Sequence, residues 1–166
     1  MLQQAPETET TLRITRTIAS PRDQVFRAWT EPDSLKRWWG VSEDFSTPIA
    51  EVDLRVGGAY RLGMLAPGEA NPFVVGGVYR EVSPPEKLVY TWVWEGGESP
   101  ADAAQSAHAA SFQEMLITVE FRDLGGSTEV VLTHEFFPDP HAKDEHNQGW
   151  MGCLGQLARL LENTPS

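Results

Sequence analysis

The sequence predicts an α+β fold in which a curved antiparallel sheet wraps around one long C-terminal helix. Three observations support this prediction. Apolar residues alternate with a period of two through most of residues 47–136, which is typical of half-buried strands. Turn residues such as Gly57-Gly58 and Gly125-Gly126 separate these segments, so successive strands should pair antiparallel. The C-terminal segment has a helical period and is long enough to cover the sheet.

The first predicted element is a strand over Thr11–Ile18, where polar and apolar residues alternate. Its inward face carries Leu12, Ile14, Arg16 and Ile18. Residues 1–10 are polar and acidic and lack the basic and apolar regions of a signal peptide. We therefore expect a disordered tail over 1–10 and a single domain over 11–162.

Two short helices are predicted after this strand. Ser20 and Pro21 are typical of a helix start, with Ser20 as the capping residue. The second helix opens at Pro32 and ends at Gly40. The apolar sides of the two helices carry Val25, Phe26, Trp29, Leu35, Trp38 and Trp39.

Six strands follow, predicted at 47–56, 59–65, 73–82, 87–95, 115–122 and 128–136. Gly76-Gly77 lies inside the third of them and predicts a bulge or a sharp bend. In the last strand the alternation places Val130, Leu132, His134 and Phe136 on the inward face. Residues 96–114 are too long for a hairpin turn and are predicted as a loop.

The last element is a helix over 142–162. Its apolar stripe consists of Trp150, Cys153, Leu154, Leu157 and Leu161. The helix also contains Gly149, Gly152 and Gly155, each of which costs about 1 kcal/mol relative to alanine. Three such residues indicate either a face that other groups approach closely or a bend.

The inward faces are rich in aromatic residues, and this predicts a cavity. A strongly curved sheet around a helix seldom closes completely, so space can remain between aromatic walls. The alternative is that the same side chains form a plain packed core. The candidate ligand-binding residues are Trp38, Trp39, Tyr60, Tyr90, Trp92, Trp94, His134, Trp150, Cys153, Leu154 and Leu157.

Few residues of the predicted interior carry chemistry. His134 lies among apolar neighbours and is either a core histidine or, alternatively, a catalytic acid or base. Arg16 is a candidate polar anchor for a ligand head, with a partly buried salt bridge as the alternative reading. Cys153 is expected to be a small buried hydrophobe. His134, His141, Glu145 and His146 lack zinc-ligand spacing, so no metal is expected. The sequence has no phosphate loop or dinucleotide fingerprint, so no cofactor is expected either.

Composition excludes several partner classes. The net charge of −11 disfavours nucleic acids and anionic membrane surfaces. No apolar run is long enough to insert into a bilayer. The single cysteine excludes an internal disulfide and suits a cytoplasmic location. A homodimer through exposed sheet or helix surface is left open.

Several motifs together resemble the START-like (SRPBCC) superfamily, and most closely the branch related to the C-terminal domain of the activator of the heat shock protein 90 ATPase. The opening motif runs from Ala19 to Pro32 (ASPRDQVFRAWTEP) and is followed by Leu35 and Trp38-Trp39-Gly40. The supporting motifs are EVDLRVGGAY at 51–60, GVYREV at 77–82, LVYTW at 88–92, VEFRD at 119–123, LTHEFFP at 132–138 and Gly149-Trp150. The likeness covers about residues 11–162.

This resemblance implies the helix-grip fold, with a hydrophobic pocket between the sheet and the C-terminal helix. Relatives in the wider superfamily bind lipids, sterols or polyketides, and some are cyclases. Co-chaperone activity is not carried over, because ten polar leading residues cannot replace the additional N-terminal domain of those activators. A chaperone partner therefore has no support.

We expect a non-catalytic protein that binds a small hydrophobic or aromatic, lipid- or polyketide-like ligand between the sheet and the C-terminal helix. One alternative is a cyclase- or hydratase-like enzyme that uses His134 in the same cavity. The other is a stress-related protein-interaction module.

Overall fold

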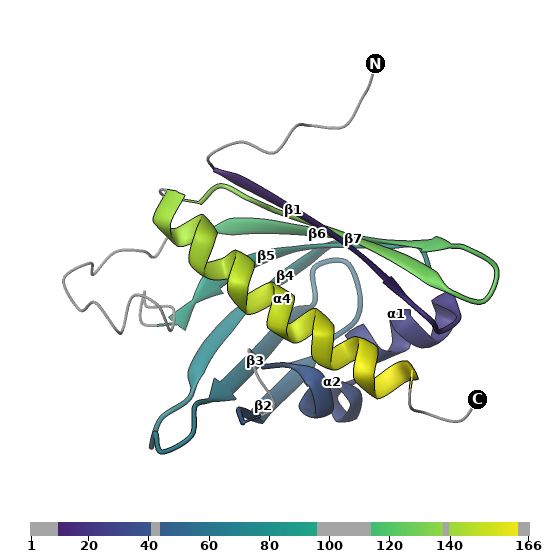
Figure 1. Cartoon of the computed structure of the whole chain (residues 1–166). Helices are drawn as coiled ribbons and strands as arrows, with labels where there is room; N and C mark the ends of the chain where they lie inside the picture. The colour runs from purple at the N-terminus through teal and green to yellow at the C-terminus, as the bar shows by residue number, and fades with distance from the viewer. Residues whose placement is uncertain (1–9, 41–43, 96–113, 138–139, 163–166) are drawn as a thin grey trace.

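The computed structural model describes residues 10–40, 44–95, 114–137 and 140–162, and these ranges contain the predicted helix-grip fold (Figure 1). Of the predicted tail, residues 1–9 lie outside the described residues, as does nearly all of the predicted loop, residues 96–113. Thr10 is described, and its carbonyl accepts the backbone N–H groups of Phe136 and Phe137. This last residue of the predicted tail is therefore bonded to the domain.

The described residues form a seven-stranded antiparallel sheet in the order β1-β7-β6-β5-β4-β3-β2. The strands are β1 Thr11–Ile18, β2 Ser46–Val52, β3 Ala59–Leu65, β4 Phe73–Ser83, β5 Lys87–Trp94, β6 Met115–Asp123 and β7 Thr128–Glu135. Strands β2 to β7 follow one another as a meander, as predicted from their short connections. Strand β1 pairs with β7, so the free edges of the sheet are β1 and β2.

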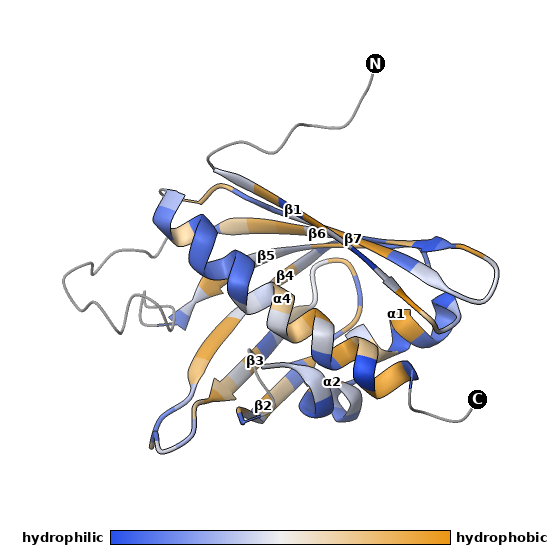
Figure 2. Cartoon of the chain, in the orientation of Figure 1, coloured by the Kyte–Doolittle hydropathy of each residue, from blue (hydrophilic) through white to orange (hydrophobic). Residues whose placement is uncertain are grey.

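Three helices of the described residues cover one face of this sheet (Figure 1). Helix α4, Pro140–Glu162, crosses the sheet and packs against β1 and α2. Helices α1, Arg22–Thr30, and α2, Pro32–Trp38, close one end, with α2 lying against β2. The first half of α4 is hydrophilic, whereas its second half is more apolar (Figure 2). No helix of the described ranges is long and apolar enough to span a membrane.

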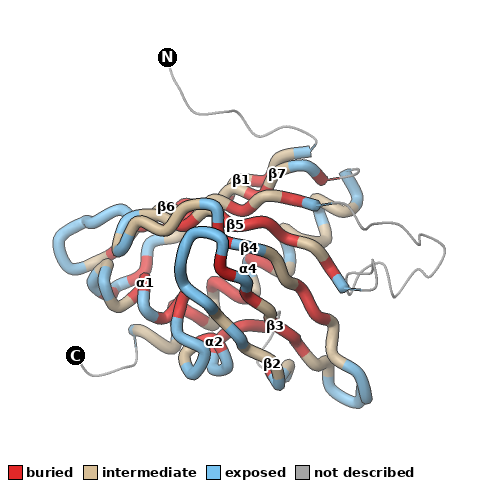
Figure 3. The backbone as a smooth tube through the Cα atoms, turned by 180° about the vertical axis from the view of Figure 1, so that it is seen from behind, coloured by how far each residue is buried: buried red, intermediate tan, exposed pale blue. Residues whose placement is uncertain are grey.

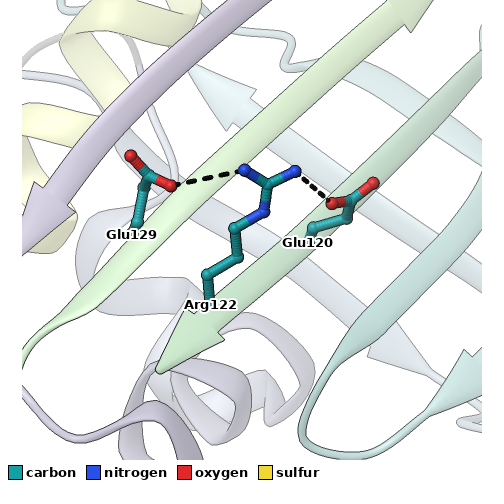
Figure 4. Close-up of polar contacts among 3 residues, drawn as sticks. All are labelled: Glu120, Arg122 and Glu129. Atoms are coloured by element: carbon teal, nitrogen blue, oxygen red, sulfur yellow. Dashed lines mark hydrogen bonds and ion pairs between the residues drawn. The ribbon is translucent and has the colours of Figure 1, made fainter. Parts of the chain in front are cut away.

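The predicted inward faces of the strands are buried except at Arg16, which is half-buried, and Phe136, which is exposed. The strands are most buried toward the middle of the molecule (Figure 3). The outer face is polar by contrast. There the Arg122 guanidinium lies between two carboxylates, with Nη2 2.9 Å from Oε1 of Glu120 and Nη1 3.5 Å from Oε1 of Glu129 (Figure 4). Such exposed ion pairs contribute about 0–1 kcal/mol to stability. The candidate site therefore lies on the inner face.

Two predicted element ends are wrong. Strand β2 ends at Val52 rather than at residue 56, because Asp53 accepts the Arg55 backbone N–H and turns the chain before Gly57. Ser20 does not cap α1, because Pro21 is the capping residue and the Ser20 hydroxyl instead donates to Oε1 of Gln24 at 3.2 Å.

The end of β7 also differs from the prediction. Phe136 has a positive φ of 74° and is 55% exposed, whereas Phe137 is 2% exposed. The left-handed residue changes the phase of the alternation, so Phe137 takes the inward position expected for Phe136. Its ring stacks on that of His134 with centroids 4.2 Å apart.

The predicted irregularity at Gly76-Gly77 is a close approach of two strands. A Cβ atom on Gly77 would overlap the carbonyl oxygen and the hydroxyl of Thr91 on β5. That hydroxyl accepts the backbone N–H of Val78 at 2.9 Å in place of a regular ladder bond. The register shift itself falls later, between Tyr79 and Glu81. Glycine is required here because there is no room for a side chain.

We expect Gly77→Ala to lower the free energy of unfolding by about 1–3 kcal/mol, the usual cost of forcing atoms into a packed region. Gly126→Ala is the matched control, because a Cβ atom on Gly126 meets nothing within 4 Å. It should change stability by no more than about 0.5 kcal/mol. Urea unfolding of both variants measures the difference, and equal stabilities would contradict the close approach.

Candidate functional site

All six tryptophans of the chain pack in one connected cluster on the inner face. The members are Trp29 of α1, Trp38 of α2, Trp39 directly after α2, Trp92 and Trp94 of β5, and Trp150 of α4. Trp150 links the two ends of the cluster, with centroid distances of 6.2 Å to Trp29 and 5.3 Å to Trp92. The cluster thus joins the sheet to each of the described helices.

Four of the six indole N–H groups have hydrogen-bond partners. Trp29 donates to the Tyr90 hydroxyl at 3.1 Å, and Trp38 donates to the Ala28 carbonyl at 2.9 Å. Trp94 and Trp150 donate to histidine nitrogens. The buried Nε1 atoms of Trp39 and Trp92 have no partner among the described residues. Native interiors seldom leave buried donors unpaired, so these two need an explanation.

A small pocket adjoins this cluster between the short helices and strands β2 to β5. Its nine lining residues are Trp29, Leu35, Trp38, Trp39, Val52, Tyr60, Leu62, Tyr79 and Tyr90. The cavity volume is about 10 Å³, which is close to the space that one water molecule needs. None of the lining residues carries a charge at neutral pH, so the pocket is suited to an uncharged guest.

The three tyrosines of the pocket keep their hydroxyl protons at neutral pH. Burial raises the pKa of Tyr60, of Tyr79 and of Tyr90 above the usual value of 10.0. The Tyr60 hydroxyl donates to the Thr91 carbonyl at 2.5 Å, which uses its proton. Tyr90 accepts from Trp29. No hydrogen bond of the Tyr79 hydroxyl is formed within the described part of the chain.

The structure brings four of the candidate ligand-binding residues to this pocket: Trp38, Trp39, Tyr60 and Tyr90. The other seven, which lie outside it in the packed core, are Trp92, Trp94, His134, Trp150, Cys153, Leu154 and Leu157. Among the described residues, the rings of Trp92, His134 and Trp150 contact one another, with centroids 5.3 to 6.4 Å apart. The pocket lies toward the β2 edge.

Five lining residues were not candidates: Trp29, Leu35, Val52, Leu62 and Tyr79. Trp29 and Leu35 were predicted on the apolar sides of the short helices, and Leu62 shares the inward face of Tyr60. The sequence therefore predicts that these three residues are buried, but it does not predict that they lie beside a cavity. Tyr79 lies two residues after Gly77. Its aromatic side chain in a predicted strand was the sequence feature that could have identified it as a lining residue.

The hydrogen bonds of buried His134 and half-buried His146 fix the tautomer of each imidazole. Trp150 Nε1 donates to His134 Nδ1 at 3.1 Å, so the proton of His134 lies on Nε2, which is 3.3 Å from the Met115 sulfur. Trp94 Nε1 donates to His146 Nε2 at 3.0 Å, and His146 Nδ1 donates to the Ala142 carbonyl at 2.8 Å. The two imidazoles thus carry opposite tautomers, each held by an indole.

These bonds bear on the predicted catalytic alternative. His134 is fully buried, and both of its nitrogens are engaged by core side chains. Burial, with a contribution from His146, lowers the pKa of His134 well below 6.5. Cys153 is equally enclosed, and burial raises the pKa of its thiol to about 12, which leaves it protonated. Neither residue is placed to meet a substrate in the pocket.

The predicted polar anchor lies away from the pocket as well. Arg16 is half-buried on β1 and pairs in register with Val130. A Cβ atom on Gly155 of α4 would lie 4.0 Å from its Nη1 atom, so the guanidinium runs alongside the helix. Within the described residues it makes no ion pair, and no group of three or more metal-ligating side chains gathers there either.

Comparison with known proteins gives a consistent result. The family model described as Activator of Hsp90 ATPase homolog 1-like protein matches residues 19–162. A crystal structure of a Chromobacterium violaceum protein is 29% identical with a TM-score of 0.79, covering 95% of this chain and 100% of that one. One from Nitrosomonas europaea is 26% identical with a TM-score of 0.73, covering 96% and 98%.

A solution structure of an AHSA1-like protein from Aeromonas hydrophila is also similar. It is 26% identical with a TM-score of 0.69, and the alignment covers 91% of this chain and 92% of that one. No curated protein sequence matches the chain. The likeness to these structures extends over nearly the whole fold.

We predict that His134 makes stability fall in mild acid. Because its pKa in the folded protein lies below 6.5, the unfolded chain binds a proton there that the folded chain does not. Between pH 7.0 and 5.5 this linkage should remove about 1 kcal/mol from the free energy of unfolding.

The test compares urea unfolding of the wild type and of His134→Gln at both pH values. The variant is less stable throughout, but its loss between the two pH values should be smaller by about 1 kcal/mol. His141→Gln, in the exposed first turn of α4, keeps His134 and should retain the wild-type loss. Identical pH dependence in all three proteins would refute the linkage.

Proposed function

The chain belongs to the Activator of Hsp90 ATPase homolog 1-like family within the START-like (SRPBCC) superfamily, and from that premise we propose that it binds a small apolar or aromatic molecule in the pocket beside the short helices. The superfamily contains ligand-binding domains, which supports a binding function. The observation that carries the proposal is an uncharged cavity whose walls are mostly tryptophan and tyrosine.

The size of the pocket bears on the ligand. A volume of about 10 Å³ does not hold an aromatic ring, so the walls move apart on binding. Val52 is the one half-buried residue among the nine that line the pocket. It lies on β2, which among the described strands pairs with β3 alone. In this proposal the ligand enters beside Val52. Because the pocket is small, a single ring or a short chain is favoured among lipid- and polyketide-like molecules.

The binding is non-catalytic in this proposal. The cyclase-like alternative depends on His134, which lies outside the pocket with both nitrogens engaged. The alternative of a protein-interaction module needs an exposed surface suited to a partner protein. Nothing about the described residues argues specifically for such a surface.

Filling the pocket should abolish binding. Val52→Phe places a ring where the guest would lie, so toluene should bind at least about tenfold more weakly than to the wild type. Toluene titrations followed by the six indole N–H signals in a nitrogen–proton correlation spectrum measure this. In the wild type, the signals of Trp29, Trp38 and Trp39 should move most.

The matched control is Val56→Phe, the same change at a position that is 64% exposed and outside the pocket. It should bind toluene as the wild type does. Saturable binding that survives Val52→Phe unchanged, or no saturable binding to the wild type, would overturn the proposed function. For the wild type purified from its own host, native mass spectrometry should identify the retained ligand by its added mass.

A further inference from the structure

The Trp39 indole provides information about the ligand. Trp39 lines the pocket and is 4% exposed, and its Nε1 atom has no partner among the described residues. An indole N–H can only donate a hydrogen bond, so nothing but an acceptor satisfies it. Trp92 has the second unpaired indole, but it lies outside the pocket. The comparison of these two residues separates a pocket effect from a core effect.

Two tyrosine hydroxyls of the pocket can also donate a hydrogen bond to a ligand. Tyr90 Oη accepts from Trp29, and within the described ranges its own proton goes to no acceptor. The Tyr79 hydroxyl likewise forms no bond in that part of the chain. Because burial raises the pKa of both phenols, both hydroxyls remain protonated at neutral pH. The pocket thus presents one obligate donor and two hydroxyl groups able to donate.

The acceptor on the ligand is uncharged. No basic residue lines the pocket, and the chain carries a net charge of −11. A carboxylate or phosphate buried there would have no counter-charge, which is strongly unfavourable. A carbonyl oxygen accepts hydrogen bonds without bringing a charge, and the aromatic walls accommodate the ring or chain that carries it.

We propose that the ligand is a neutral aromatic or conjugated ketone or quinone, whose carbonyl oxygen accepts the Trp39 indole N–H while its ring lies among the pocket tyrosines. This assignment rests on the proposed function and names the ligand class of the same pocket. It predicts preference for a carbonyl over a hydrocarbon of equal shape.

The test uses acetophenone and α-methylstyrene, two molecules of nearly equal shape that differ in a carbonyl oxygen against a methylene group. Their affinities for the full chain are measured by titration in nitrogen–proton correlation spectra. Acetophenone, and not α-methylstyrene, should move the Trp39 indole proton downfield, as hydrogen-bond formation does. This readout needs no substitution and therefore does not depend on a variant folding.

Variants test the same bond by affinity. In Trp39→Phe the ratio of acetophenone affinity to α-methylstyrene affinity should fall about 5- to 10-fold from its wild-type value, the usual worth of one hydrogen bond. Trp92→Phe removes the unpaired donor outside the pocket and should keep the wild-type ratio.

The outcomes are distinguishable. The carbonyl assignment is overturned if Trp39→Phe keeps the wild-type ratio of acetophenone affinity to α-methylstyrene affinity. It is also overturned if the Trp39 indole proton has the same chemical shift with acetophenone as with α-methylstyrene. The latter result would mean that a buried water satisfies the indole. Binding of α-methylstyrene in those cases leaves the proposed function standing. If neither molecule binds to the wild type, the proposed function and this assignment fall together.

Discussion

The interior depends on the mutual packing of six tryptophans at the junction of the sheet with its helices. Large aromatic rings contribute much apolar surface, but each indole also brings a donor that must be satisfied when water is excluded. Trp29, Trp38, Trp94 and Trp150 find acceptors on a tyrosine, a backbone carbonyl and two histidines. Those partners are in turn held in one orientation.

This requirement divides the inner face into two unlike halves. Beside β7 and the middle of α4, the described side chains are joined by indole–imidazole bonds and by the stacked rings of His134 and Phe137. Toward β2 the wall is an edge strand, and the contacts are made by short helices rather than by α4. Packing there is incomplete, and an indole donor remains unpaired. The proposed binding site lies where the aromatic network ends.

Much of the fold was predictable from local pattern. The alternation that placed Val130, Leu132 and His134 inward is confirmed by their burial, because one face of a strand repeats every second residue. The errors fall where a backbone bond outside the pattern intervened. The carbonyl of Asp53 ended β2 early, and the left-handed Phe136 passed the inward position to Phe137.

The amino-acid pattern alone was enough to predict the architecture, the aromatic inner face and, to within one residue, all strand ends except that of β2. Each of these follows from periodicity and turn chemistry over a few residues. Only the assembled tertiary structure decided which aromatic residues border a cavity. Trp39 and Trp92 read alike in the sequence, as inward tryptophans, yet one lines the pocket and the other is enclosed in the core. Empty space depends on how closely distant elements approach one another, and no local period records that distance.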